Sequence, residues 1–240
     1  MEDILTSSVF GILRYLPVEK GLLPFLRESQ MQGRSHALSD IGEGTRVEYQ
    51  FWPMLQERGL HGENEIECHA CEPDLLLKIH KANGSRLYVL VEAKLFSSKS
   101  SRPSDDSHAP YDQLAREWDN LVCLSHRENA EPLLIFLTAD FSIPADQIKE
   151  SRDEYLQKRP GHQFICGWLT WRQIPSIFRD NPDARLQDLV KLCDRLNLRF
   201  FDRRICMGAV PKISWRFQSG ELRIEWLRGP IFKFDWRYEG

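Results

Sequence analysis

Apolar residues follow a helical period in the first part of the chain. Residues 4–30 carry this period with breaks at Pro17 and Gly21, which predicts two short amphipathic helices that serve packing. Residues 39–59 carry a second helical stripe, so the sequence predicts a longer helix there, kinked at Pro53. The apolar face of that helix is expected to cover a sheet.

The central part of the chain alternates between patterns typical of strands and of helices. Asn83-Gly84 lies between two apolar runs and predicts a β-hairpin. The alternation as a whole implies an α/β core. Strands are expected at residues 65–70, 74–80, 86–95, 132–140 and 164–171, and helices at 111–124, at 145–159 and twice between 173 and 199.

A polar segment, residues 97–110, interrupts this alternation and is expected to form a mobile loop. Two interpretations of it stay open. The loop with Lys99 and Arg102 either clamps nucleic acid or is simply disordered.

The end of the chain changes to a period of two. Apolar and polar residues alternate from Ile213 to Tyr238, and Ser219-Gly220 supplies a turn, which predicts an antiparallel β addition of three strands. Three parts are therefore expected: an N-terminal helical segment at 1–38, an α/β core at 39–175, and C-terminal helices with a β-meander at 176–240.

Composition narrows the class of protein. The chain has 240 residues, of which 42% are hydrophobic, so it is expected to fold. It has no run of 18 apolar residues and starts acidic, which predicts a cytoplasmic protein without a membrane partner. Six scattered cysteines are expected to be reduced thiols. The formal net charge is −3, so any site for a polyanion must be local.

Two charged residues at the end of an apolar strand are the main candidates for chemistry. Side chains two apart in a strand share a face, so Glu92 and Lys94 point the same way, and the predicted hairpin can bring Asp74 beside Glu92. Two partly buried carboxylates favour a compensating hard cation such as Mg²⁺. Such an ion polarises a bound phosphate and activates a water molecule, which a nearby lysine can orient or deprotonate. The pattern therefore suits phosphodiester hydrolysis.

The order and spacing of these residues resemble a sequence motif of a known protein family. Pro73-Asp74 followed by Glu92-Ala93-Lys94 resembles the motif of the PD-(D/E)xK nuclease superfamily, whose members have a restriction-endonuclease-like fold. The segment around Glu48 resembles the helix that carries a glutamate before the PD strand in Holliday junction resolvases. Gln113 resembles the glutamine that members often place on the helix after the ExK strand. The resemblance covers roughly residues 40–140.

The resemblance implies a role for each of these residues. Asp74 and Glu92 would bind Mg²⁺ or Mn²⁺, together with the backbone carbonyl next to Glu92, and Glu48 would be a further ligand. Lys94 would activate or stabilise the nucleophile, and Gln113 would orient the site.

Two positions depart from the pattern or leave it open. Glu43 could replace Glu48 as the first acid, because only the register of the predicted helix distinguishes them; we prefer Glu48. The RecB-like branch of the superfamily has a tyrosine four residues after its glutamine, whereas this chain has Glu117 four residues after Gln113.

The sequence thus predicts an α/β protein with a restriction-endonuclease-like central mixed β-sheet, flanking helices and a C-terminal antiparallel β addition. The expected function is Mg²⁺-dependent hydrolysis of phosphodiester bonds in nucleic acid, with DNA as the expected substrate. A homodimer or a larger complex is compatible with this function. The alternatives are a non-catalytic nucleic-acid-binding or assembly subunit that keeps the fold, and a phosphoryl hydrolase for a small nucleotide.

Overall fold

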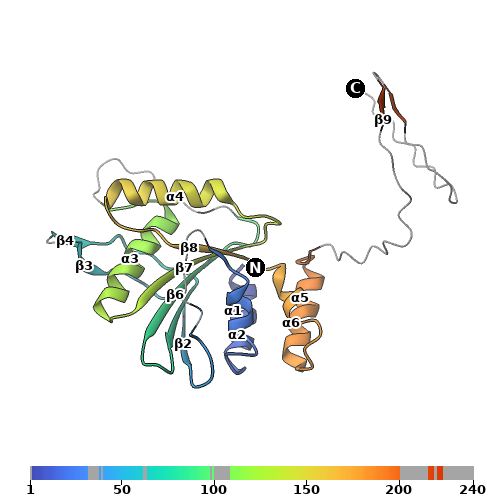
Figure 1. The fold of residues 1–240 in the computed structure, drawn as a ribbon, viewed down its shortest axis with the longest axis horizontal. Helices are drawn as coiled ribbons and strands as arrows, with labels where there is room; N and C mark the ends of the chain where they lie inside the picture. The colour runs from blue at the N-terminus through green and yellow to red at the C-terminus, as the bar shows by residue number, and fades with distance from the viewer. Residues whose placement is uncertain are drawn as a thin grey trace. The chain divides into compact units, whose positions relative to one another are not determined.

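The chain divides into two compact units, Met1–Phe200 and Phe201–Gly240 (Figure 1). Each unit is described by itself. In this computed structural model the described residues are 2–31, 38, 40–61, 64–97, 99, 109–200, 216–218 and 221–223.

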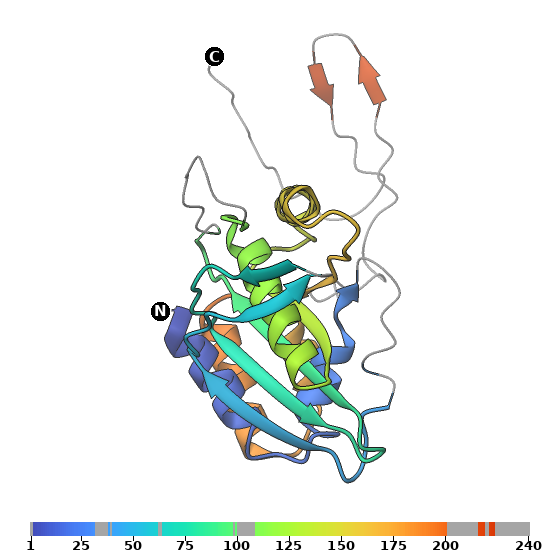
Figure 2. The same ribbon diagram turned by 90° about the vertical axis from the view of Figure 1, so that its left-hand side faces the viewer.

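A mixed six-stranded sheet forms the centre of the first unit (Figure 2). Its strands lie in the order β1-β8-β7-β6-β5-β2. Strands β6, β7 and β8 are parallel, and the other neighbouring pairs are antiparallel. The strands are β1 (Gln30–Met31), β2 (Arg46–Phe51), β5 (Leu75–His80), β6 (Arg86–Ala93), β7 (Glu131–Thr138) and β8 (Cys166–Thr170).

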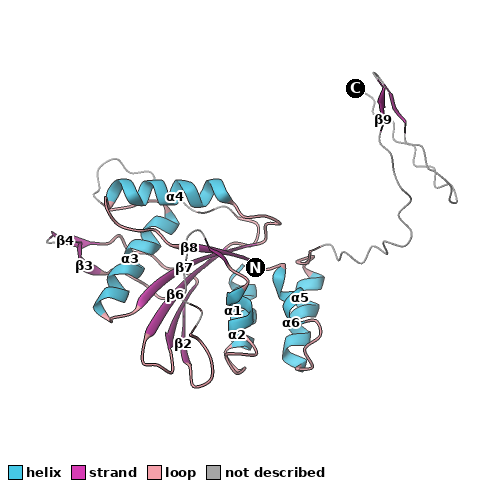
Figure 3. Cartoon of the chain, viewed as in Figure 1, coloured by secondary structure: helices cyan, strands magenta, loops and turns pink. Residues whose placement is uncertain are grey.

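Helices cover both faces of this sheet (Figure 3). One face packs against four helices from the two ends of the unit, and the other packs against two helices from its middle. The first group comprises α1 (Glu2–Leu13), α2 (Leu22–Arg27), α5 (Gln173–Phe178) and α6 (Ala184–Arg195), and the second comprises α3 (Gln113–Arg127) and α4 (Ala145–Lys158).

The period of two along each strand divides the apolar core into two layers. Leu75 and Leu77 belong to the layer beneath α1, α2, α5 and α6, whereas Leu76 belongs to the layer beneath α3 and α4. Strands β6 and β7 are buried on both faces, which explains why their sequences are almost continuously apolar. The predicted α/β class with a central mixed sheet and flanking helices is confirmed.

The hairpin predicted at Asn83-Gly84 joins β5 to β6, which pair antiparallel. Gly84 has a φ of 85°, a conformation that glycine adopts without steric cost. The Asn83 side chain accepts hydrogen bonds from the backbone N–H and the hydroxyl of Ser85, at 2.9 and 2.7 Å. The turn fixes the register of the two strands, in which Leu75 lies opposite Val91.

The helix predicted at residues 39–59 is wrong, because this segment is extended. It forms β2, a bridge between Leu55 and Cys71, and the start of a small hairpin of β3 (Arg58–His61) and β4 (Asn64–Glu67). Val47, Tyr49 and Phe51 fit a helical stripe only roughly, but they alternate strictly with exposed residues, as a half-buried edge strand requires. Pairing with β5 therefore outweighs the helical pattern.

The cysteines of the described residues are free thiols, as expected. Cys68 and Cys123 share a hydrogen bond over 3.4 Å between their sulfur atoms, and both side chains are buried. This contact joins the end of the β3–β4 hairpin to α3.

The second unit contains a described antiparallel pair, β9 (Arg216–Gln218) with β10 (Glu221–Arg223). The rest of the expected C-terminal β addition lies outside the described residues and stays a prediction. Among the helices of the described part, none has the length and apolar character needed to cross a membrane.

Candidate active site

Asp74 lies one residue before β5, at the point where the hairpin brings that strand beside the end of β6. Since Leu75 pairs with Val91, the next position outward places Asp74 beside Glu92. The Asp74 Oδ2 atom accepts a hydrogen bond from the backbone N–H of Ala93 over 2.8 Å. The two halves of the sequence motif are therefore joined directly.

Glu92 is the centre of the cluster and is almost completely buried, with 1% of its surface exposed. Its Oε1 atom forms an ion pair with Lys94 Nζ. The same oxygen accepts a hydrogen bond from Gln113 Nε2 over 2.5 Å. Its Oε2 atom is buried and accepts no hydrogen bond from an amide, a hydroxyl or an ammonium group, and the carboxyl group of Glu117 lies beside Glu92.

Gln113 reaches Glu92 because α3 begins beside the end of β6. Asp112 caps the helix: its Oδ1 atom accepts a hydrogen bond from the backbone N–H of Ala115 over 3.2 Å. Its Oδ2 atom bonds Lys99 Nζ over 2.6 Å. Lys99 is largely buried and also donates to Ser151 over 2.9 Å. The interpretation of Lys99 as a nucleic-acid clamp is thus wrong, because its ammonium holds the start of α3.

Glu2 is the residue that sequence reasoning missed. It opens α1, and its Oε1 atom lies 3.5 Å from Lys94 Nζ. Its Oε2 atom accepts hydrogen bonds from the backbone N–H of Leu95 over 2.7 Å and from the Ser97 hydroxyl over 2.9 Å. The resemblance to resolvases offered a signal, since it calls for a glutamate on a helix before the PD strand. The described helices before Asp74 are α1 and α2, and Glu2 lies on the first of them.

Glu48 does not lie with this cluster, which corrects its predicted place. It pairs with Lys78 in the β2–β5 register, four residues along the strand from Asp74 and thus roughly 13 Å away. Its side chain is 46% exposed and contacts Arg46 at 3.2 Å and His80 at 3.5 Å. Glu43 precedes β2 and is exposed, so it lies farther still along the same direction.

Burial shapes the electrostatics of the cluster. Burial and the neighbouring Glu92 carboxylate raise the pKa of Asp74 to about 7. Burial also raises the pKa of Glu92, although Lys94 opposes this. For Lys94, burial acts to lower the pKa, but the carboxylates of Glu92, Glu2 and Asp74 outweigh it and raise the pKa. Lys94 is therefore a cation, suited to orienting or stabilising a nucleophile.

Glu117, four residues after Gln113 on α3, faces the same cluster. It is 1% exposed on α3, one turn after Gln113. Burial and the adjacent Glu92 carboxylate raise the pKa of Glu117 well above its usual range. A protonated Glu117 can donate a hydrogen bond to Glu92.

Trp52 fixes the other side of Asp74. Its backbone N–H donates to the carbonyl oxygen of Asp74 over 3.1 Å. Its φ of 49° is left-handed, which is strained for a bulky side chain and costs about 1–3 kcal/mol. The strained turn lies directly at the candidate site, as such turns often do.

These residues fit a Mg²⁺ ion that takes only one or two ligands from the protein. In the described part of the chain, no group of three or more His, Cys, Asp and Glu side chains is arranged to hold a metal by itself. Mg²⁺ commonly uses only one or two carboxylates, with water and substrate phosphate completing its shell. Asp74 and the buried Glu92, which lie side by side, provide such a pair.

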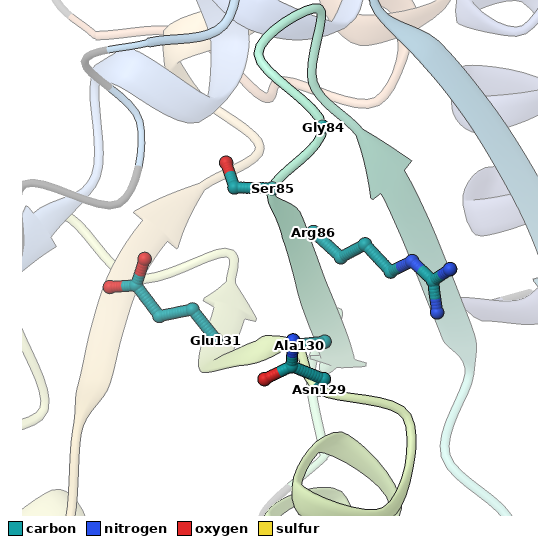
Figure 4. A pocket seen from close by; sticks show the side chains of 6 residues that line it. All are labelled: Gly84, Ser85, Arg86, Asn129, Ala130 and Glu131. Carbon is teal, nitrogen blue, oxygen red and sulfur yellow. The ribbon is translucent and has the colours of Figure 1, made fainter.

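Two cavities lie near the ends of the sheet. One, of about 430 Å³, is lined by Lys94 and adjoins the cluster. The other, of about 490 Å³, lies where β6 and β7 begin (Figure 4). It is lined by Arg86 and Glu131 and contains none of the predicted site residues.

Comparisons with known proteins add little to this geometry. No family model and no curated protein matches the chain. Among solved structures, a match is "The structure of Pyrococcus Furiosus SfsA in complex with Ca2+", with 17% sequence identity and a TM-score of 0.22. It covers 53% of this chain and 47% of that chain. At this TM-score the likeness carries no functional argument.

Proposed function

We propose that this chain is a Mg²⁺-dependent nuclease that hydrolyses phosphodiester bonds, with DNA as the expected substrate. The observation that carries the proposal is the joining of Asp74, Glu92 and Lys94 at one end of β6. Asp74 accepts a hydrogen bond from the backbone next to Glu92. Lys94 and Gln113 both contact the same oxygen atom of the Glu92 carboxylate.

Each residue has a defined task in this proposal. Asp74 and Glu92 would hold the metal, with the carbonyl oxygen of Ala93 added by the family resemblance. The metal, when bound, would polarise the phosphate and lower the pKa of an attacking water. Lys94 would orient that water and offset negative charge that develops on the phosphate.

Gln113 and Glu2 would act as positioning residues. Gln113 fixes one oxygen of Glu92 through its amide and thereby sets the orientation of the carboxylate. Glu2 holds the backbone after Lys94 and balances its charge. Groups that orient metal ligands in this way commonly change metal affinity or activity by about 10–100-fold.

The test is cleavage of circular and linear DNA, single- and double-stranded, with Mg²⁺, with Mn²⁺ and with chelator. We expect metal-dependent cleavage by the wild type and its loss in Asp74→Ala and Lys94→Ala. Glu48→Gln is the matched acidic control, because it removes an exposed carboxylate of the same sheet. Cleavage that persists in both site variants would contradict the proposal.

One observation favours a second candidate, a non-catalytic nucleic-acid-binding or assembly subunit. The described residues lack a complete set of three side-chain metal ligands. Titration with Mg²⁺ by calorimetry separates the two candidates, since a pure binding subunit needs no metal at Asp74. A wild-type protein that binds DNA without binding Mg²⁺ or cleaving would support this second function.

A further inference from the structure

The cavity of about 430 Å³ is lined on one side by Lys94 of the candidate active site and elsewhere by aromatic side chains. Two phenylalanines, Phe96 and Phe141, line it and are 76% and 56% exposed. Single exposed apolar side chains are ordinary in soluble proteins. Two large aromatic rings on one small cavity, next to the proposed reacting centre, require an explanation.

The ring of Phe141 is held in place from within the protein. The guanidinium carbon of Arg172 lies 3.7 Å from the ring centroid. Arg172 is fixed in turn, because it donates hydrogen bonds to the carbonyl oxygens of Ala139 and Asn197, each over 2.7 Å. The ring of Phe200 packs edge-on, with centroids 6.5 Å apart. A ring held in this way can bind a flat partner with little loss of conformational entropy.

The backbone on either side of Phe96 is also anchored. Glu2 accepts hydrogen bonds from the backbone N–H of Leu95 and from the Ser97 hydroxyl. The Trp171 indole N–H donates to the carbonyl oxygen of Lys94 over 3.3 Å. The Phe96 ring is therefore displayed to solvent from a fixed turn, one residue beyond the anchored Leu95.

The lining of the cavity is mixed in charge and suits a nucleobase. Lys94 belongs to the active-site side and the Arg172 guanidinium already lies over the Phe141 ring, whereas the carboxylate residue Asp140 is exposed. The same side chain could accept a hydrogen bond from an exocyclic amino group. Aromatic side chains stack on bases of any sequence, because every base has a π-face.

We propose that Phe96 and Phe141 form a stacking site for an unpaired nucleobase next to the phosphate held at Lys94. The inference rests on the proposed nuclease function and deepens it by naming the substrate class, single-stranded nucleic acid. A paired base inside a duplex has no free face to offer these rings. Discrimination against a duplex follows from the cost of unstacking and unpairing a base.

The test uses the full chain carrying Asp74→Asn, so that bound substrate stays intact in Mg²⁺. A 12-nucleotide single strand with a central 2-aminopurine reports stacking through quenched fluorescence. The same sequence is measured as single-stranded DNA, single-stranded RNA and duplex DNA. We expect both single strands to be quenched on binding, and the duplex to bind at least about tenfold more weakly.

Substitutions of the two phenylalanines test whether their rings cause the binding and the quenching. Phe96→Ala and Phe141→Ala are each expected to weaken single-strand binding about tenfold and to reduce the quenching. Phe141→Trp should restore both, because it keeps an aromatic face. Tyr15→Ala is the matched control: Tyr15 is 74% exposed, follows the far end of α1 and does not line the cavity.

Three results would overturn the stacking site: no binding of the single strands, equal affinity for the duplex, or unchanged quenching in both phenylalanine variants. Cleavage by the chain without Asp74→Asn is measured separately. If that chain cleaves while the phenylalanine variants bind as before, only the stacking site fails. If quenching behaves as expected but no substrate is cleaved, the nuclease function fails and the stacking site stands.

Discussion

Asp74 and Ala93 are joined by a hydrogen bond of 2.8 Å between a carboxylate oxygen and a backbone N–H. The bond crosses from the start of β5 to the end of β6 and places Asp74 beside Glu92. Two buried carboxylates so close together oppose folding unless a cation compensates them. The site therefore stabilises the protein less than an uncharged one of the same shape would.

Asp74→Asn is expected to stabilise the metal-free protein at pH 8. The pKa of Asp74 is about 7 in the folded state, above its value of about 3.9 in an unfolded chain. Ionised Asp74 thus disfavours the folded state, and this cost grows between about pH 4 and 7 and is constant above. The gain in unfolding free energy should be up to about 4 kcal/mol at pH 8 and much smaller at pH 5. Thermal unfolding at both pH values in chelator measures it.

Adding Mg²⁺ to the same unfolding experiment tests whether Asp74 is a metal ligand. It should raise the melting temperature of the wild type but not of Asp74→Asn, because the variant lacks a ligand. Asp180→Asn removes an exposed carboxylate and is the matched control. A variant less stable than the wild type at pH 8 in chelator would show that Asp74 is already compensated within the protein.

The parts of the site that could be predicted from the sequence depend on local rules. The turn at Asn83-Gly84 sets the hairpin, the hairpin sets the register, and the register brings Asp74 to Glu92. Because side chains two positions apart in a strand share a face, Lys94 then lies beside the Glu92 carboxylate. Gln113 follows because the helix after β6 begins beside its end.

The parts that could not be predicted depend on contacts between distant segments. Glu2 meets Lys94 across 92 positions of sequence, and nothing near Glu2 marks it as different from other acids that open a helix. The place of Glu48 could not be predicted, because the apolar residues of its segment also fit a helical stripe roughly, and the strict alternation counts only once β2 pairs with β5. Lys99 resembled a surface cation, but it lies in a buried ion pair with Asp112.

Glu2→Gln should reduce metal-dependent cleavage about tenfold while leaving the fold intact. The variant loses the charge that balances Lys94 and weakens the bonds to Leu95 and Ser97. Asp3→Asn is the matched control, because it removes the same charge from the same helix end but is exposed. Initial cleavage rates, with circular dichroism as a check of folding, measure the difference. Equal loss in both variants would assign the effect to the helix terminus and not to the site.

Glu48→Gln, in contrast, is expected to leave the cleavage rate within about twofold of the wild type. Its carboxylate contacts Arg46 and His80 at the surface, and such exposed pairs contribute at most about 1 kcal/mol to stability. The same cleavage assay compares it with Glu2→Gln. Loss of cleavage in Glu48→Gln alone would restore Glu48 as the first acid.

Gln113→Ala should lower cleavage about 10–100-fold, because the Glu92 carboxylate would lose the amide that fixes its orientation. Gln113→Glu should be at least as severe, since it adds a further acid to a buried cluster. Gln56→Ala, which removes an exposed amide, is the control. If raising Mg²⁺ restores the rate of Gln113→Ala, the defect lies in metal affinity. A rate equal to that of Gln56→Ala would remove Gln113 from the site.

A buried ion pair between the middle of α3 and the segment after α4 supports the position of α3, the helix that carries Gln113. Asp119 on α3 accepts two hydrogen bonds from Arg159, which follows α4, at 3.0 Å from Nε and 2.7 Å from Nη2. Both side chains are buried. Arg159→Ala would leave Asp119 as an uncompensated buried charge, so the unfolding free energy should fall by about 3–5 kcal/mol.

Arg185→Ala is the matched control for this change. Arg185 also bonds both oxygens of an aspartate, Asp183, but its side chain is 49% exposed, so its loss should change the unfolding free energy very little. Urea unfolding followed by tryptophan fluorescence measures both variants. Removing both partners together should cost less than Arg159→Ala, because it leaves neither a buried carboxylate nor a buried guanidinium unpaired. Equal stability losses for Arg159→Ala and Arg185→Ala would mean that water already screens the Asp119–Arg159 pair, and that apolar packing alone holds α3 against the sheet.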